Sequence, residues 1–156
     1  MGVPNILLTR IDNRMLHGQV FNWIKTVGAN LIICADDDLS KDKVNQTIMQ
    51  MTADAAGVAV RFFELQRTID IIHKAAPTQK IFIVCRNPES VKVLIDNGVP
   101  IKEVNVGNMH FTEGKTQLSK KVYVDENDLN TLKYLGSKGV DVFIQDVPGS
   151  IKTKIE

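Results

Sequence analysis

The chain lacks the features that mark several large classes of protein. Its 156 residues contain no apolar run near the roughly 18 to 20 residues that span a bilayer. The N-terminus has no basic-then-apolar pattern of the kind that forms a signal peptide. The only cysteines are Cys34 and Cys85, too few for a disulfide framework. We therefore expect a cytoplasmic protein without direct membrane insertion.

An excess of one charge is also missing. Lys and Arg number 19 against 18 Asp and Glu, a net charge of +1, so electrostatics give no reason to expect a nucleic-acid partner. The chain has no Walker loop, no Gly-x-Gly-x-x-Gly turn and no pair of Cys or His residues at zinc spacing. No nucleotide cofactor and no metal are therefore expected.

Short apolar runs alternate with helical patterns along the whole chain. Its length fits one domain, residues 1–156, and 44% hydrophobic residues is a globular composition. Strands are expected near residues 6–8, 31–34, 58–62, 81–85, 104–106, 122–124 and 140–144. This alternation predicts an α/β fold, a single open, mostly parallel sheet of about seven strands with helices on both faces.

Helical patterns lie between these strands, and several have clear end signals. Trp23 and its apolar neighbours mark the first helix, and Gly28 is its expected stop. Asn87 before Pro88, and Asp125 further along, are typical helix N-caps. The second helix is predicted from an apolar stripe of four side chains: Val44, Ile48, Met51 and Ala55.

In such sheets, functional residues collect at the carboxyl ends of the strands, and the loop after the first strand is the richest in chemistry. It places His17 beside the start of a helix, where free N–H groups and the helix dipole favour anions. Arg10 and Arg14 add planar donors suited to phosphate oxygens, and Gly18 lets the backbone approach a phosphate. These residues predict a nucleophilic histidine in a phosphate site. The alternative is an ordinary charged surface loop.

Other polar residues at the same edge of the sheet are weaker candidates for the phosphate site. Asp12 either holds one of the arginines in position or caps the loop, and Gln19 is a further donor for phosphate. Asn108 and His110 follow another strand and are second-rank candidates, since a single loop histidine is more often structural. The triplet at residues 36–38 resembles a magnesium or receiver site but is interpreted as a solvated turn, because the other acidic and basic residues of such sites are missing.

The two cysteines each close an apolar run and are interpreted as buried small hydrophobes. The alternative concerns Cys85, which precedes Arg86 and a helix start, a setting that can produce a reactive thiolate.

The loop Arg10–Val20 resembles the active-site loop of the IIB components of the mannose-fructose-sorbose class of bacterial sugar phosphotransferase systems. The segments Lys80–Arg86, Val104–Phe111 and Val142–Pro148 are also similar to that family, most of all to its N-acetylgalactosamine-type members. The resemblance covers nearly the whole chain. Met15 departs from the Leu or Val expected there, which affects no charged role.

This resemblance implies a phosphocarrier in which the Nδ1 atom of His17 accepts a phosphoryl group from a phosphohistidine of a IIA protein. The donor is expected to be a separate polypeptide. The group would then pass to a sugar held by the membrane subunits IIC and IID, which would keep the protein at the inner face of the membrane. No cofactor is implied, and a homo-oligomer is left open.

The main alternative from another class is a small histidine phosphatase or mutase, which also places a His-Gly pair after the first strand. The motif of those enzymes is Arg-His-Gly, with arginine directly before the histidine, whereas Leu16 precedes His17 in this chain. His110 could still serve as the second histidine of such an enzyme. A domain that only binds sugar phosphates is a third possibility.

Overall fold

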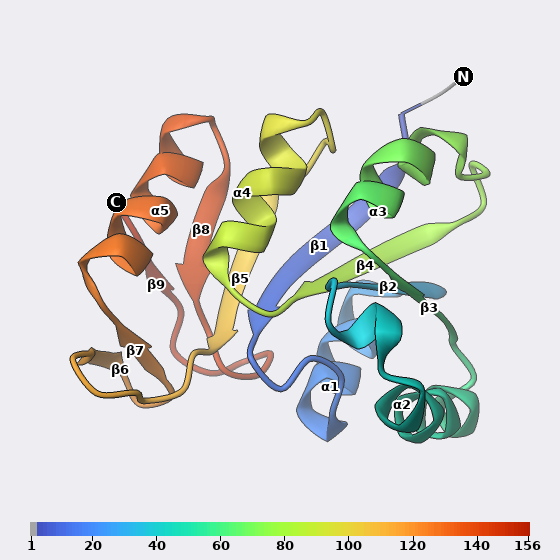
Figure 1. Ribbon diagram of the computed structural model, residues 1–156, viewed down its shortest axis with the longest axis horizontal. Helices are drawn as coiled ribbons and strands as arrows, with labels where there is room; N and C mark the ends of the chain where they lie inside the picture. Colours follow the sequence, from blue (N-terminus) through green and yellow to red (C-terminus); the bar gives the residue numbers. More distant parts are fainter. Residues whose placement is uncertain (1–2) are drawn as a thin grey trace.

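The computed structural model describes residues 3–156 and has a parallel sheet at its centre (Figure 1). The strands of this sheet are β1 (Asn5–Asp12), β2 (Leu31–Ala35), β3 (Ala59–Phe63), β4 (Lys80–Cys85), β5 (Glu103–Asn108), β8 (Asp141–Ile144) and β9 (Thr153–Lys154). The seven strands lie in the order β3-β2-β4-β1-β5-β8-β9. All neighbours pair in parallel except β9, which is antiparallel to β8. The predicted fold class is confirmed.

One predicted strand belongs elsewhere. Residues 122–124 form β7 (Val122–Val124), which pairs with β6 (Thr116–Ser119) in a separate antiparallel hairpin. Val122 and Val124 are buried because the hairpin covers one end of the core, so their alternation does not indicate a place in the main sheet. The seventh strand of that sheet is instead β9, whose two exposed residues give no strand pattern in the sequence.

Helices cover both faces of the sheet, as the sequence predicts. The helices are α1 (Gly18–Val27), α2 (Lys43–Ala56), α3 (Leu65–Ile71), α4 (Pro88–Asp96) and α5 (Glu126–Ser137), with short 3-10 turns η1 (Leu39–Lys41) and η2 (Ile72–Lys74). Alternate strand residues belong to two hydrophobic clusters, because successive side chains of a strand point to opposite faces. Ile32 and Phe82 pack with residues of α1 and α2, while Ile33 and Ile83 pack with residues of α4 and α5.

The helix ends follow the signals in the sequence. The Asn87 side chain accepts a hydrogen bond from the Ser90 N–H at 2.9 Å, and Pro88 occupies the first turn. Asp125 forms a capping box with Asp128. Gly28 ends α1 with a φ of 76°, a left-handed conformation in which glycine has no steric penalty. These caps confirm the predicted boundaries.

The strand order places the loop after β1 at a topological switch point. From β1 the chain passes to α1 on one face, whereas from the adjacent β4 it passes to α4 on the other face (Figure 1). Loops that diverge in this way leave a crevice at the carboxyl edge of the sheet, where α/β proteins bind ligands. Asn13 of the His17 loop and Arg86 after β4 line a cavity at this edge.

Both cysteines lie inside the sheet. Cys34 and Cys85 have no exposed surface, and burial raises the pKa of each thiol well above its ordinary value. A thiol kept neutral in this way is a poor nucleophile. The buried interpretation is confirmed, and the reactive role considered for Cys85 is wrong. Within residues 3–156 no helix has both the length and the apolar character needed to cross a membrane.

Candidate functional site

A tight turn carries the chain from the end of β1 to His17. The Met15 N–H donates to the Asp12 carbonyl at 2.9 Å, and the Arg14 N–H donates to Asp12 Oδ1 at 2.9 Å. Met15 has a φ of 62°, which is unfavourable for a residue with a side chain. Its side chain is buried in the cluster that includes Leu16 and Val20, and this packing holds the strained turn in place.

His17 is the residue before the first turn of α1. Its Nε2 atom lies 2.7 Å from Asp12 Oδ2, and its side chain is 11% exposed. A carboxylate can only accept a hydrogen bond, so the neutral imidazole carries its proton on Nε2. The lone pair is then on Nδ1. The loop thus favours the tautomer that leaves Nδ1 of His17 unprotonated.

Asp12 is the centre of a buried polar chain. Its Oδ2 atom accepts a hydrogen bond from Arg10 Nε at 3.1 Å, while Arg10 Nη1 donates to Asn105 Oδ1 at 2.7 Å and to the Asp146 carbonyl at 2.9 Å. Arg10 and Asp12 have no exposed surface. Burial lowers the pKa of Arg10, and the charge of Asp12 acts in the opposite direction. Asp12 therefore both holds an arginine and caps the loop, the two roles that the sequence left open.

The position of Arg10 differs from the prediction. We expected its guanidinium to meet phosphate directly, but it lies beneath Asp12 and donates to acceptors inside the protein. A fully buried guanidinium cannot contact a phosphoryl group at the surface. Arg10 supports the site through Asp12, by balancing its charge and holding the carboxylate against His17.

The Arg10 guanidinium packs directly over Gly107 of β5. A Cβ atom at residue 107 would lie 2.0 Å from Arg10 Cζ. This close approach explains the glycine, which sequence analysis did not single out.

Gly107→Ala is expected to displace the guanidinium and to lower the free energy of unfolding by about 1–3 kcal/mol. Gly136→Ala in α5 is the matched control, because apart from the adjacent backbone of its own helix nothing lies within 4 Å of the added Cβ. We expect the control to be neutral or slightly stabilising, since alanine favours helix. Equal urea midpoints for the two variants would contradict the role given to Gly107.

Three kinds of polar group lie in the loop or at the start of α1. Arg14 is exposed, and α1 begins at Gly18, followed by Gln19, so its N-terminal N–H groups lie beside the histidine. Lys121 Nζ lies 3.3 Å from Gln19 Oε1 and 2.9 Å from Asp146 Oδ2. Sequence analysis missed Lys121, because only the β6–β7 hairpin brings it to the start of α1.

Asn108 and His110 lie at the same edge but play different parts from His17. The Asn108 carbonyl accepts a hydrogen bond from the Asn13 N–H at 3.0 Å, which fastens the turn to the end of β5. His110 is exposed and lines a cavity of about 260 Å³ together with Asn13 and Arg86. Asn108 thus has a structural contact through its backbone, and His110 lies beside the loop.

Of the acidic triplet, Asp37 and Asp38 are exposed as predicted, but Asp36 is not. Asp36 is buried, accepts the Leu39 N–H at 3.0 Å, and pairs with Arg86 Nη2 at 2.8 Å. Its hydrogen bond raises the pKa of Arg86, whose Nη1 atom also donates to the Asn13 carbonyl at 3.1 Å. Asp36 therefore braces the His17 loop through Arg86. Within residues 3–156 no group of three His, Cys, Asp or Glu side chains is arranged to hold a metal.

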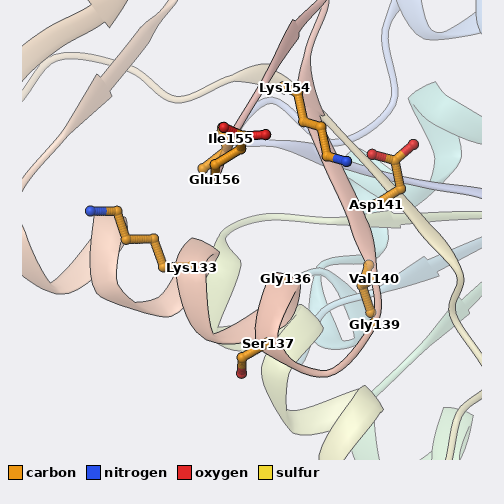
Figure 2. Close-up of a pocket in the computed structure, with 9 residues that line it drawn as sticks. All are labelled: Lys133, Gly136, Ser137, Gly139, Val140, Asp141, Lys154, Ile155 and Glu156. Carbon is orange, nitrogen blue, oxygen red and sulfur yellow. The ribbon is translucent and has the colours of Figure 1, made fainter.

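The cavity shown in Figure 2 lies near the amino end of β8, on the side of the sheet away from the carboxyl ends of the strands. Its volume is about 570 Å³, and its lining residues come from the end of α5, the start of β8 and the C-terminal segment. Asp141, one of them, is the first residue of β8, whereas the His17 loop is at the carboxyl ends of the strands. This cavity is not part of the histidine site.

The sequence of this chain matches that of a known protein family. The family described as the sorbose subfamily IIB component of the phosphotransferase system matches residues 6–156. The chain belongs to this family. As a IIB component it is a phosphotransferase that carries phosphoryl groups during sugar uptake, as predicted. The phosphatase alternative is not supported, and the residue before His17 is the buried Leu16 rather than an arginine.

Individual relatives are similar to this IIB component in sequence and structure along nearly its whole length. It is 54% identical to the N-acetylgalactosamine-specific phosphotransferase enzyme IIB component 1 of Escherichia coli K12, over 99% of both chains. The crystal structure of the N-acetylgalactosamine-specific IIB component 1 from Escherichia coli superimposes with a TM-score of 0.95 at 54% identity, covering 97% of this chain and 100% of that one. The mannose-specific EIIAB component of Escherichia coli K12 is 33% identical over 95% of this chain and 46% of its own length.

Proposed function

We propose that His17 Nδ1 is the phosphoryl acceptor of a single IIB domain formed by this chain. The observation that carries this proposal is the 2.7 Å contact between His17 Nε2 and Asp12 Oδ2. This contact leaves the lone pair on Nδ1, which is also the phosphoryl acceptor that the family resemblance implies. The donor is the phosphohistidine of a IIA protein, and the acceptor is a sugar held by the membrane subunits IIC and IID.

Asp12 supports the chemistry in both directions. When Nδ1 attacks the phosphorus atom, a P–N bond forms on His17 while the P–N bond of the donor histidine breaks. Positive charge then grows on the His17 ring, and the Nε2–H bond to the Asp12 carboxylate stabilises it. In the second step a sugar hydroxyl attacks phosphorus and the P–N bond of His17 breaks, with its electron pair returning to Nδ1. The hydroxyl proton passes to water, and His17 leaves as the neutral imidazole with its proton on Nε2.

The charge of the phosphoryl group is met by groups at the surface of the loop. The N–H groups of Gly18 and Gln19 follow His17 at the start of α1, Lys121 contacts Gln19, and Arg14 lies in the same loop, so these groups would supply donors and positive charge. Lys121 is already paired with Asp146, which limits how strongly it can hold a phosphate. Moderate stabilisation suits a carrier, because a site that bound the group too tightly would not release it.

The sugar is proposed from the relatives. The 54% identical protein is named for N-acetylgalactosamine, so N-acetylgalactosamine or a related amino sugar is the proposed substrate of the system. The protein would reach the membrane by binding IIC and IID.

Radioactive phosphoenolpyruvate tests this function directly. With the general phosphotransferase proteins and a IIA partner present, we expect the chain to become labelled, and without the IIA partner we expect no label. The label should then move to N-acetylgalactosamine when membranes containing IIC and IID are added. Labelling without IIA, or rapid release of inorganic phosphate by the isolated protein, would contradict the proposal.

Arg14→Ala tests the role of the exposed guanidinium. We expect labelling to slow by about 10- to 100-fold, the effect of losing one charge-assisted hydrogen bond. Stability should change little because the side chain is exposed. Lys25→Ala, at the other end of α1, is the control for the loss of one charge. Transfer at the wild-type rate in Arg14→Ala would remove this residue from the site.

A further inference from the structure

Helix α2 carries three large apolar side chains on the outside of the molecule, while its Met49 packs against the core. Val44, Ile48 and Met51 are 72%, 57% and 67% exposed, and Ala53 is the one buried residue of the helix. The stripe that predicts this helix in the sequence therefore faces solvent instead of the core. An apolar ridge of this kind indicates an interaction surface.

The ridge lies beside a hollow in the same surface. A cavity of about 270 Å³ is lined by Lys43, Gln46, Thr47, Gln50, Met51 and Phe62. A two-fold interface uses the same patch on both copies, so that patch must contain both the projection and the place that receives it. The α2 surface has both.

The charges of α2 favour one relative orientation. Lys43 is its first residue and Asp54 lies near its end, and the other residues of the helix are uncharged. In an antiparallel pair, Lys43 of one copy lies near Asp54 of its partner, whereas a parallel pair would bring like charges together. The small number of charges also limits repulsion when the surface meets itself.

We propose that two copies of this chain associate through α2. The helices pack antiparallel about a two-fold axis near Ile48, with the ridge of each copy in the hollow of the other. One helix face is a small interface, so the dimer is weak and forms at high protein concentration. The His17 loop is not part of the patch, so this inference does not rest on the proposed phosphoryl transfer.

Sedimentation velocity over a range of protein concentrations tests the dimer. We expect the wild type to pass from monomer to dimer, and Ile48→Asp to weaken association by more than about tenfold, because two carboxylates would meet near the axis. Val93→Asp is the matched control, since it adds the same charge to an exposed apolar position of α4. A wild type that stays monomeric throughout, or equal association of both variants, overturns the proposal.

Exchanging the two charges tests the orientation. Lys43→Asp and Asp54→Lys should each weaken the dimer, and the double variant should restore it. Both substitutions suit their helix ends, since acids favour the first turn and bases the last, so loss of helix does not explain weaker association. Failure of the double variant to recover overturns antiparallel packing. Binding of a monomeric protein to IIC and IID membranes through Ile48 would overturn the choice of a second copy as partner.

Discussion

Replacing His17 with alanine is expected to reduce phosphoryl labelling to the background level. The substitution removes the proposed nucleophile. The measurement is incorporation of label from phosphoenolpyruvate in the presence of the general proteins and a IIA partner. Because the side chain is partly exposed, the variant should remain folded.

His17→Gln gives a sharper form of this test. The glutamine amide can still donate a hydrogen bond to Asp12 but has no nucleophilic nitrogen. We expect it to be as inactive as His17→Ala. His110→Ala and His73→Ala are the controls, because these are the other histidines of the chain, and both should keep most of the labelling. Label retained after the loss of His17 would contradict its role as acceptor.

Asp12→Ala is expected to have the largest effect on stability, lowering the free energy of unfolding by about 3–5 kcal/mol. The reason is the burial of Arg10, whose guanidinium would remain inside the protein without its carboxylate partner. The Arg14 N–H would also lose its acceptor, and His17 the partner of its Nε2 atom. Urea unfolding measures the loss of stability, and labelling measures the effect on transfer.

The double variant Arg10→Leu with Asp12→Leu separates charge from packing. It removes both members of the buried pair, so its stability should lie above that of Asp12→Ala. Its labelling should remain slow, because the orientation of His17 is still lost. Asp12→Ala with wild-type stability and a wild-type labelling rate would contradict the buried chain as the support of the site.

The fold was predictable where local patterns and tertiary structure agree. Strands such as β2 and β4 are continuous apolar runs because both of their faces are covered, and the caps at Asn87 and Asp125 mark helix starts by local hydrogen bonds. β7 was misplaced because its buried valines alternate as they would in a strand of the main sheet, and β6 and β9 were missed because they are short and exposed.

The residues of the site were predictable because they lie in one loop, but their arrangement was not. Arg10 is held by Asn105 and by the Asp146 carbonyl, more than 90 residues away, so the sequence could not show that it lies beneath Asp12. Lys121 reaches Gln19 only through the hairpin. Likewise, periodicity detects the stripe on α2, but it does not show which side of the helix meets the sheet.

NMR of the phosphorylated protein tests the central claim most directly, because nitrogen and phosphorus resonances identify the atom that carries the phosphoryl group. We predict one phosphohistidine, at His17, with phosphorus bonded to Nδ1. The proton stays on Nε2 and is hydrogen-bonded to the Asp12 carboxylate. Phosphorus on Nε2 of His17, or on any other residue, would contradict the account.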